Sequence, residues 1–226
     1  MGASISQPGA ASVVRDVLEQ AIWKGSGMTE PLVDIEFTPF PKIGRLKRGC
    51  VITEKIDGTN AAVRVLVGSR VREGVRGVEV DGHTLFAQSR SRFISPGDDN
   101  FGFAAWVWKN APLLVTLGEG LHFGEWWGGG IQRGYGMSER VFSLFNVGRW
   151  REPAALPECC RLVPVLFEGD FSIDAVDAAL DALRVHGSAA APGFNNPEGV
   201  VTFHTATRTL FKTTLEKDDA PKGRES

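Results

Sequence analysis

Alternating apolar and polar residues predict a β-rich first half of the chain. The runs are separated by turn-forming residues, of which Asp81-Gly82 is the clearest pair. Strict alternation is typical of strands that bury one face, and an Asp-Gly pair favours a hairpin turn. Residues 49–88 therefore predict an antiparallel meander. Its strands are expected at residues 51–53, 60–67, 78–80 and 84–88.

Apolar residues spaced three and four apart predict three helices. The most distinct helix begins after Ser172, whose hydroxyl suits a helix N-cap, and ends before Gly187. A second helix is expected from Asp98 or Asp99 to about Leu114, and a third at residues 13–22. Further strands are expected at residues 121–127, 141–147, 198–204 and around Leu210. The run GGGIQRGYG lacks a phosphate-binding G-x-x-x-x-G-K-[ST] pattern, and we expect a flexible hairpin connection there.

This mixture of elements predicts an α+β fold with antiparallel sheets and flanking helices. With 226 residues, of which 42% are apolar and 23% charged, the chain is long enough for one substantial core. We expect a single domain at residues 13–215, preceded by a flexible N-terminus at residues 1–12. The charged stretch 216–226 is expected to be a flexible tail.

Charge and cysteine content narrow the class of protein. A net charge of −2 argues against a binder that coats nucleic acid with its whole surface, although arginines cluster between Arg70 and Arg92. Cys50 and the adjacent pair Cys159-Cys160 lack metal-binding spacing, which favours a reducing compartment. No run of 18 apolar residues and no signal-peptide pattern is present. We expect a soluble, cytoplasmic protein.

Lys55 is the candidate nucleophile. It ends the first predicted strand, and the turn-forming residues Asp57-Gly58-Thr59 follow at once, so it is expected on a rigid strand end facing a cleft. An amine attacks only in its neutral form, which a neighbouring cation or burial must favour. The four letters K-x-D-G also fit a solvated turn. The segments that follow must therefore decide between the two.

Six segments occur in a specific order along the chain. They are EKIDGTN at 54–60, SRSR at Arg90, FGEWWG at Glu125, FSLFNV at Phe145, EGVV at Glu198 and LFKTT at Lys212. Together they resemble the nucleotidyltransferase motifs of the covalent polynucleotide ligase superfamily. They resemble in particular the ATP-dependent RNA ligases, which include phage RNA-repair and trypanosome RNA-editing enzymes and whose first motif reads EK-x-x-GTN. The resemblance covers residues 51 to about 214.

The resemblance implies an adenylyltransferase domain with antiparallel sheets around an ATP cleft, and a reaction in three steps. A lysine attacks the α-phosphate of ATP, giving lysyl-AMP and pyrophosphate. AMP then passes to a 5′-phosphate end, and a 3′-OH attacks that end and releases AMP. The implied cofactors are ATP and Mg²⁺ or Mn²⁺. The implied partners are RNA ends, with a nicked duplex or a DNA–RNA hybrid as further candidates.

The resemblance also implies the catalytic residues. Lys55 is the nucleophile, and Glu198 matches the acid that binds the metal ion. Lys212 matches the lysine that contacts the α-phosphate and stabilises its transition-state charge. Phosphoryl transfer depends mainly on positioning and charge neutralisation, so cations and metal-binding acids suit it.

Nucleotide-binding roles are implied for five further residues. Glu54 and Asn60 flank the nucleophile in the first motif, whose segment contacts the adenine base. Arg90 matches the arginine that contacts the nucleotide and the 5′-phosphate, with Arg92 as an alternative. Glu125 matches the acid that accepts a hydrogen bond from a ribose hydroxyl. Phe145 matches the aromatic residue that stacks on adenine, with Phe142 as the competing choice.

Two departures from the family pattern concern the end of the chain. The last motif usually reads K-x-K, whereas Lys212 has no second lysine in either register, and Lys217 lies five residues on. Only 14 residues follow Lys212, too few for the OB-fold of DNA ligases or the helical C-terminal domain of many RNA ligases. The sequence therefore predicts self-adenylylation, and these two departures argue against efficient strand sealing.

Other functions remain open at this point. A DNA nick-sealing ligase would use the same motifs, and a capping guanylyltransferase is disfavoured because that family typically has arginine where Asn60 stands. A non-catalytic nucleotide or nucleic-acid binding module could keep the fold, although the retained Lys55, Glu125 and Glu198 argue against it. The sequence does not give strand preference, oligomeric state or pathway.

Overall fold

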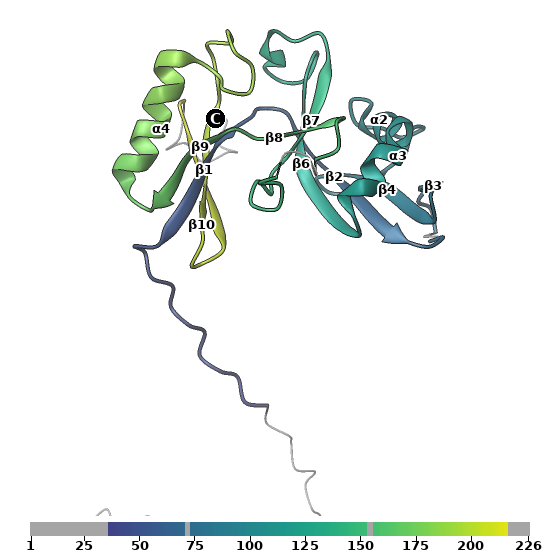
Figure 1. Cartoon of the computed structure of the whole chain (residues 1–226), viewed down its shortest axis with the longest axis horizontal. Helices are drawn as coiled ribbons and strands as arrows, with labels where there is room; N and C mark the ends of the chain where they lie inside the picture. Colours follow the sequence, from purple (N-terminus) through teal and green to yellow (C-terminus); the bar gives the residue numbers. More distant parts are fainter. Residues whose placement is uncertain (1–35, 71–72, 153–155, 217–226) are drawn as a thin grey trace, which may run out of the picture. The chain divides into compact units, whose positions relative to one another are not determined.

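The computed structural model describes residues 36–70, 73–152 and 156–216. The helices and strands of these residues belong to one compact unit, Ile43–Ser226 (Figure 1). In the other unit, Met1–Lys42, residues 36–42 are exposed and have no regular structure. The expected helix at 13–22, the expected flexible ends and Lys217 lie outside the described residues. The domain bounds 13–215 stay a prediction.

The first sheet contains four antiparallel strands in the order β11-β10-β1-β9. They are β1 (Gly49–Lys55), β9 (Val165–Asp170), β10 (Gly199–His204) and β11 (Thr209–Thr214). In β1, Cys50, Ile52 and Glu54 are buried on one face, whereas Lys55 ends the other face. The apolar residues of the buried face pack against helix α4. One face of this sheet is therefore structural, and the other is available to the site.

Helix α4 (Ile173–His186) begins and ends as the sequence predicts. The Ser172 hydroxyl accepts a hydrogen bond of 3.1 Å from the amide of Ala175, and Gly187 follows with φ 77°. Its buried residues recur at the spacing of one helix face. They are Val176, Ala179, Leu180 and Leu183.

The second sheet has seven strands, with β3-β4-β2-β6-β7-β8 as its path and β5 paired to β4. They are β2 (Thr59–Val67), β3 (Val78–Val80), β4 (His83–Ser89), β5 (Phe93–Ile94), β6 (Gly120–Gly128), β7 (Arg140–Leu144) and β8 (Cys160–Leu162). Pairing is antiparallel except between β7 and β8. The structure therefore confirms an α+β fold with antiparallel sheets.

The expected meander at residues 49–88 is wrong in its pairing. The turn Asp81-Gly82 does join two antiparallel strands, and both residues have positive φ, 47° and 71°, as a tight hairpin turn requires. However, β2 pairs with β4 and β6, which leaves β3 at the sheet edge, and β1 belongs to the other sheet.

Short helices cover the core face of the second sheet. The single helix expected as far as Leu114 is two helices, α2 (Phe103–Lys109) and α3 (Ala111–Leu114), followed by the 3₁₀ turn η1 (Val115–Leu117). The break follows from Pro112, which has no N–H and whose ring excludes a continuous helix. Helix α2 begins at Phe103 and its N-cap residue is Gly102, not Asp98 or Asp99, although the Asp99 carboxylate accepts hydrogen bonds from two amides of the first turn. The aromatic rings of Phe103 and Phe142 lie 5.0 Å apart in this core.

The glycine-rich run between β6 and β7 is not a simple flexible connection. It contains a 3₁₀ turn, η2 (Gly134–Gly136), and its Ile131 and Tyr135 are 0% and 3% exposed. Tyr135 packs in a third apolar cluster with Ile56 and Trp127. The run is therefore anchored to the core beside the turn that follows Lys55.

No helix in the part of the chain that the structure describes is long and apolar enough to cross a bilayer.

Candidate active site

Lys55 and Glu198 form the centre of the site. Lys55 is the last residue of β1, and its register partner in β10 is Gly199, which follows Glu198. Their side chains form an ion pair with 2.5 Å between Nζ and Oε2, and they are 23% and 13% exposed. Because β1 lies between β9 and β10, the lysine ends a strand that is held on both sides.

Gly199 has a structural reason to follow the glutamate. A Cβ atom at this position would lie 2.2 Å from the carbonyl oxygen of Thr213 in β11, and its φ of 154° lies in the range that side chains avoid. The Glu-Gly pair of the EGVV segment therefore lets β10 and β11 approach closely. That approach fixes Glu198 at the start of β10, opposite the lysine.

Glu125 lies on β6 and turns toward the same site. Its Oε1 accepts a hydrogen bond of 3.1 Å from the amide of Gly58, and its Oε2 accepts one of 3.2 Å from Asn60 Nδ2. Burial raises the pKa of Glu125 to about 7, although the nearby Lys55 charge and the Gly58 hydrogen bond act to lower it. This carboxyl is therefore partly protonated at neutral pH.

A loop arginine and tyrosine hold the turn after Lys55. The amide of Asp57 donates a hydrogen bond of 2.8 Å to the Tyr135 hydroxyl, and Arg133 Nε lies 3.1 Å from Asp57 Oδ2. Arg133 also donates to Asn196, with 2.7 Å from its Nη1 to the side-chain oxygen. It thus connects the turn after Lys55 with the segment before Glu198. Sequence reasoning missed both residues, and the only signal was an Arg and a Tyr within a glycine-rich run.

Glu54 lies on the other face of β1. It is 1% exposed, and its carboxylate accepts hydrogen bonds from the Ser188 hydroxyl at 2.6 Å and the Ala190 amide at 2.8 Å. Burial raises the pKa of this carboxyl, while those hydrogen bonds act to lower it. The side chain therefore fixes the loop before β10, and does not project beside the Lys55 amine. Its expected nucleotide-binding role stays a prediction.

Strand register places Lys212 on the Lys55 face of the first sheet. Thr53 pairs with Val201, and Val201 pairs with Lys212 in β11, so these three side chains share a face. Lys55 shares this face because it lies two residues beyond Thr53. Lys212 is exposed, and its long side chain has room to turn toward the lysine–glutamate pair. Its contact with an α-phosphate stays a prediction.

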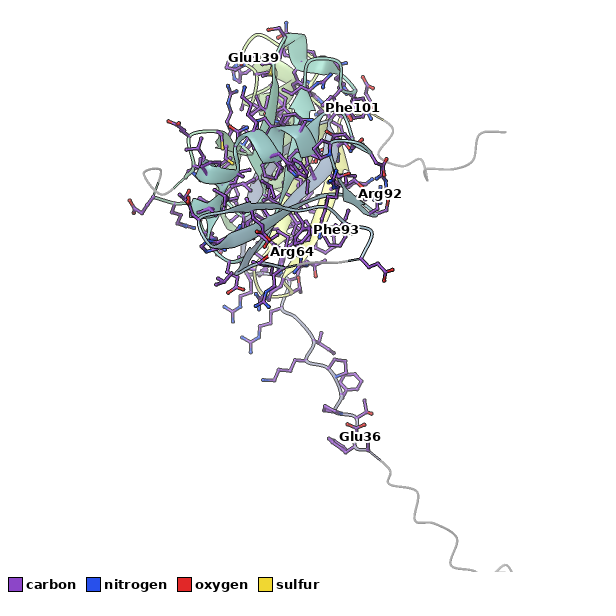
Figure 2. The ribbon with its side chains drawn as sticks, turned by 90° about the vertical axis from the view of Figure 1, so that its right-hand side faces the viewer. Glu36, Arg64, Arg92, Phe93, Phe101 and Glu139 are labelled. Atoms are coloured by element: carbon purple, nitrogen blue, oxygen red, sulfur yellow. The ribbon has the colours of Figure 1, made fainter. Side chains whose placement is uncertain are left out.

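Local contacts separate the two candidate arginines. Arg92 donates two hydrogen bonds to the carboxylate of Asp98, at 2.5 and 3.0 Å. It projects at the surface in Figure 2. Arg90 is exposed, and it makes no hydrogen bond or ion pair among the described residues. Strands β2 and β4 are antiparallel and Ser89 pairs with Ala61. Arg90, the next residue, therefore lies next to Asn60 at the end of this pair of strands. The geometry thus favours Arg90 for contact with a phosphate.

Burial separates the two candidate aromatic residues. Phe142 is fully buried and packs against Phe103 and Trp106 in the core. Phe145 follows β7 and is 41% exposed. Its register relation to β6 places it on the face that carries Glu125. Only Phe145 therefore has a ring face that a base could reach, although stacking itself stays a prediction.

Comparison with known proteins identifies the family. The sequence model described as RNA ligase matches residues 48–214, which is most of the chain. This protein belongs to the RNA ligase family. A search of curated proteins finds no match.

Solved structures share the fold. A variant of the Naegleria gruberi RNA ligase with ATP and Mn has a TM-score of 0.51 at 15% identity, covering 76% of this chain and 51% of that one. A second variant with ATP and Mn has a TM-score of 0.48 at 15% identity, covering 75% and 50%. An apo variant has a TM-score of 0.48 at 17% identity, covering 76% and 50%. The chain thus spans about half the length of these proteins.

Proposed function

We propose that this protein is an ATP-dependent RNA ligase that joins 3′-OH and 5′-phosphate ends through lysyl-AMP and an adenylylated RNA end. The observation that carries the proposal is the ion pair of Lys55 and Glu198, 2.5 Å apart, in a chain of the RNA ligase family. Glu125 lies close enough to Lys55 for the lysine charge to affect its carboxyl. Lys55, Glu125 and Glu198 lie in the first, third and fifth of the six family segments, to which the resemblance gives roles in catalysis or ribose binding.

In the first step, the neutral Lys55 amine attacks the α-phosphorus of ATP. The new P–N bond forms as the bond to pyrophosphate breaks, and pyrophosphate leaves with the electron pair. Lys55 must first lose a proton, and Glu198 Oε2 is an acceptor at hydrogen-bonding distance. Lys212 supplies a positive charge that offsets the charge developing on the phosphate.

Glu198 fits a divalent metal ion. Mg²⁺ and Mn²⁺ prefer carboxylate, phosphate and water oxygens, and Mg²⁺ is usually held by one or two carboxylates together with substrate phosphates. Among the described residues no group of three His, Cys, Asp or Glu side chains could hold a metal alone. We therefore assign Glu198 as a ligand shared with ATP, where the ion would neutralise phosphate charge.

In the second step, a 5′-phosphate oxygen of RNA attacks the AMP phosphorus and the P–N bond to Lys55 breaks. Arg90 binds that 5′-phosphate in this proposal, which its exposure and its lack of a partner among the described residues support. In the third step, the 3′-OH of the other end attacks the activated phosphate, its proton is lost to solvent, and AMP leaves. RNA ends, alone or in a nicked duplex, are the proposed partners.

The cysteines agree with a reducing compartment. Cys50, Cys159 and Cys160 are all free thiols. Disulfides are rare where glutathione and thioredoxin keep thiols reduced. We therefore propose a cytoplasmic location.

Strand joining tests the proposed function directly. The full chain is incubated with Mg²⁺, ATP labelled at the α-phosphate, and single-stranded or nicked substrates made of RNA or DNA. An RNA ligase labels itself and joins RNA 3′-OH to 5′-phosphate ends, and Lys55→Ala does neither. Equal joining of all-DNA nicks would instead indicate a DNA nick-sealing ligase. Binding of ATP or RNA without any labelled protein would indicate a non-catalytic module.

A further inference from the structure

The site face of the second sheet continues beyond Glu125 along β6. Phe123 lies two residues before Glu125, so its side chain shares that face at a distance of about 7 Å along the strand. It is 57% exposed. Its carbonyl oxygen accepts a hydrogen bond of 3.0 Å from the amide of Phe145. Two exposed phenylalanine side chains, one on β6 and one directly after β7, therefore lie beside the nucleotide site.

Arg64 lies on the same face, one strand away. It pairs with Leu121 of β6, and Ala62 pairs with Phe123, which makes Arg64 and Phe123 diagonal neighbours. Such positions are about 7–8 Å apart, within reach of long side chains. On the other side Arg64 pairs with Phe86, whose ring lies 5.8 Å from that of Phe93. Arg64 and Phe93 accordingly appear in the same region of Figure 2.

The Arg64 guanidinium has no protein partner in the described part of the chain. Its Nε atom is buried without a hydrogen bond, and no ion pair or other hydrogen bond involves it. The strands β2, β4, β5, β6 and β7, all fully described, carry a single acidic side chain, the buried Glu125. An unpaired arginine on a face almost free of acids is complementary to phosphate.

We propose that Arg64 and Phe123 bind the RNA strand next to its reacting end, with a backbone phosphate on Arg64 and a base stacked on Phe123. This inference rests on the proposed function and names the residues that hold its substrate. Proteins that bind single strands combine positive charge with aromatic side chains, and stacking tolerates any base. Continuity with the Glu125 site places the bound nucleotides where the end can reach Lys55-AMP.

The test separates RNA binding from self-adenylylation in the full chain. Affinity is measured by fluorescence anisotropy with a labelled, 5′-phosphorylated single-stranded RNA oligonucleotide at several salt concentrations. Self-adenylylation is measured without RNA, and AMP transfer is followed from protein already carrying AMP. The variants are Phe123→Ala, Phe123→Leu, Phe123→Tyr and Arg64→Gln. Matched controls on helix α4 are Val185→Ala, which removes a side chain at a residue that is 74% exposed, and Arg184→Gln.

Phe123→Ala and Phe123→Leu should weaken RNA binding about fivefold or more and slow AMP transfer, because both lose the ring face. Phe123→Tyr keeps that face and should bind like the parent. Arg64→Gln should bind more weakly and reduce the slope of log affinity against log salt by about 0.7, the value for one phosphate contact in a single strand. All variants should self-adenylylate within about twofold of the parent, since the contacts proposed for Arg64 and Phe123 are with RNA.

Parent-like RNA affinity in Phe123→Ala and Arg64→Gln would overturn the inference. Parent-like RNA affinity in Phe123→Leu would also overturn it, because it would show that no base stacks on the Phe123 ring. Loss of self-adenylylation in these variants would also overturn it and assign them to the nucleotide site. Failure of the proposed function gives a different result. If the parent protein binds RNA through Phe123 but does not label itself, the ligase function is contradicted and the proposed RNA-binding surface is not. A parent that labels itself while Phe123→Ala binds normally contradicts only the surface.

Discussion

The Lys55 amine and the Glu198 carboxylate form an ion pair, with 2.5 Å between Nζ and Oε2, where the last residue of β1 faces the residue that precedes β10. A lysine in this state is positioned for attack but is not yet a nucleophile. The pair must open, or pass its proton on, before a P–N bond can form. Glu198 therefore has two partners in the proposed reaction, first the lysine and then the metal–ATP complex.

Replacing Glu198 by Gln tests the second of these roles. The amide has nearly the same shape, but it lacks the charge that binds a divalent ion. We expect loss of most self-adenylylation in Mg²⁺, with partial recovery in Mn²⁺ and little change in thermal unfolding, because the side chain is partly exposed. Rates are measured by label transfer over a range of metal concentrations. Parent-like labelling of this variant at low Mg²⁺, or full labelling of the parent in EDTA, would show that Glu198 is not the metal ligand.

Glu125 should make the stability of the fold depend on pH. Its pKa rises from an ordinary 4.5 to about 7 in the folded protein, chiefly through burial. Below about pH 4.5 both states are protonated. Between that pH and about 7 the unfolded state loses the proton first, so the free energy of unfolding falls as the pH rises, by about 3 kcal/mol at most, and then levels off.

Glu125→Gln removes this titration, and urea unfolding of both proteins at several pH values measures it. The unfolding free energy of the parent minus that of the variant should fall from pH 5 to pH 7.5, because only the parent carries the Glu125 carboxyl. Glu54, which also has a raised pKa, is present in both proteins and is eliminated by the comparison. A difference independent of pH would show that the Glu125 carboxyl titrates normally.

Arg133 should act on the reaction through positioning. Arg133→Ala removes both the bond to Asp57 and the bonds to Asn196, so the turn after Lys55 and the segment before Glu198 lose their common partner. We expect a fall in the maximal rate of self-adenylylation of roughly tenfold or more, with a smaller change in the ATP concentration needed for half that rate. Arg133→Lys should recover little, since one ammonium does not replace a forked donor.

The matched control for Arg133 is Arg184→Ala. Arg184 is an exposed arginine whose one ion pair within the described residues is with Asp181 of its own helix, and its removal should not change the rate. The double variant Arg133→Ala with Asp57→Asn should lose less activity than the sum of the two single losses, expressed as free energies. Both changes act on the same contact, the one between Arg133 and Asp57. Additive losses would indicate that Arg133 acts elsewhere. An unchanged rate in Arg133→Ala would remove it from the site.

Helices and strands could be predicted from the sequence where neighbouring residues alone determine them. The strands ending at Lys55 and containing Glu125, and the capped helix after Ser172, lie where alternation and capping residues predict them. Strand partners are decided by tertiary packing, which explains the wrong meander. Strand β9 was missed because its mixed exposure produces no clean alternation. The break before Pro112 could have been predicted from the proline itself.

The candidate site was predictable where chemistry dictates the residue type. The roles of nucleophilic amine, metal-binding carboxylate and stacking ring each require a particular residue type. These residue types occur in a fixed order in the sequence motifs. Residues that position those groups leave no such pattern. Arg133 and Tyr135 act through a loop whose glycines suggest flexibility, and only the fold shows that Tyr135 is buried against Trp127, with ring centroids 5.0 Å apart. Likewise, only burial distinguishes Phe145 from Phe142.

The central claim is that Lys55 carries AMP. Intact mass spectrometry after incubation with ATP and Mg²⁺, followed by peptide mapping, measures this directly. We predict a mass increase of one AMP on the peptide that contains Lys55, in a bond that acid cleaves and alkali spares, as expected for a phosphoramidate. Lys55→Ala and Lys55→Arg should both remain unmodified, because a guanidinium stays protonated and does not attack. AMP on any other residue, or an undiminished adduct in Lys55→Ala, would contradict the account.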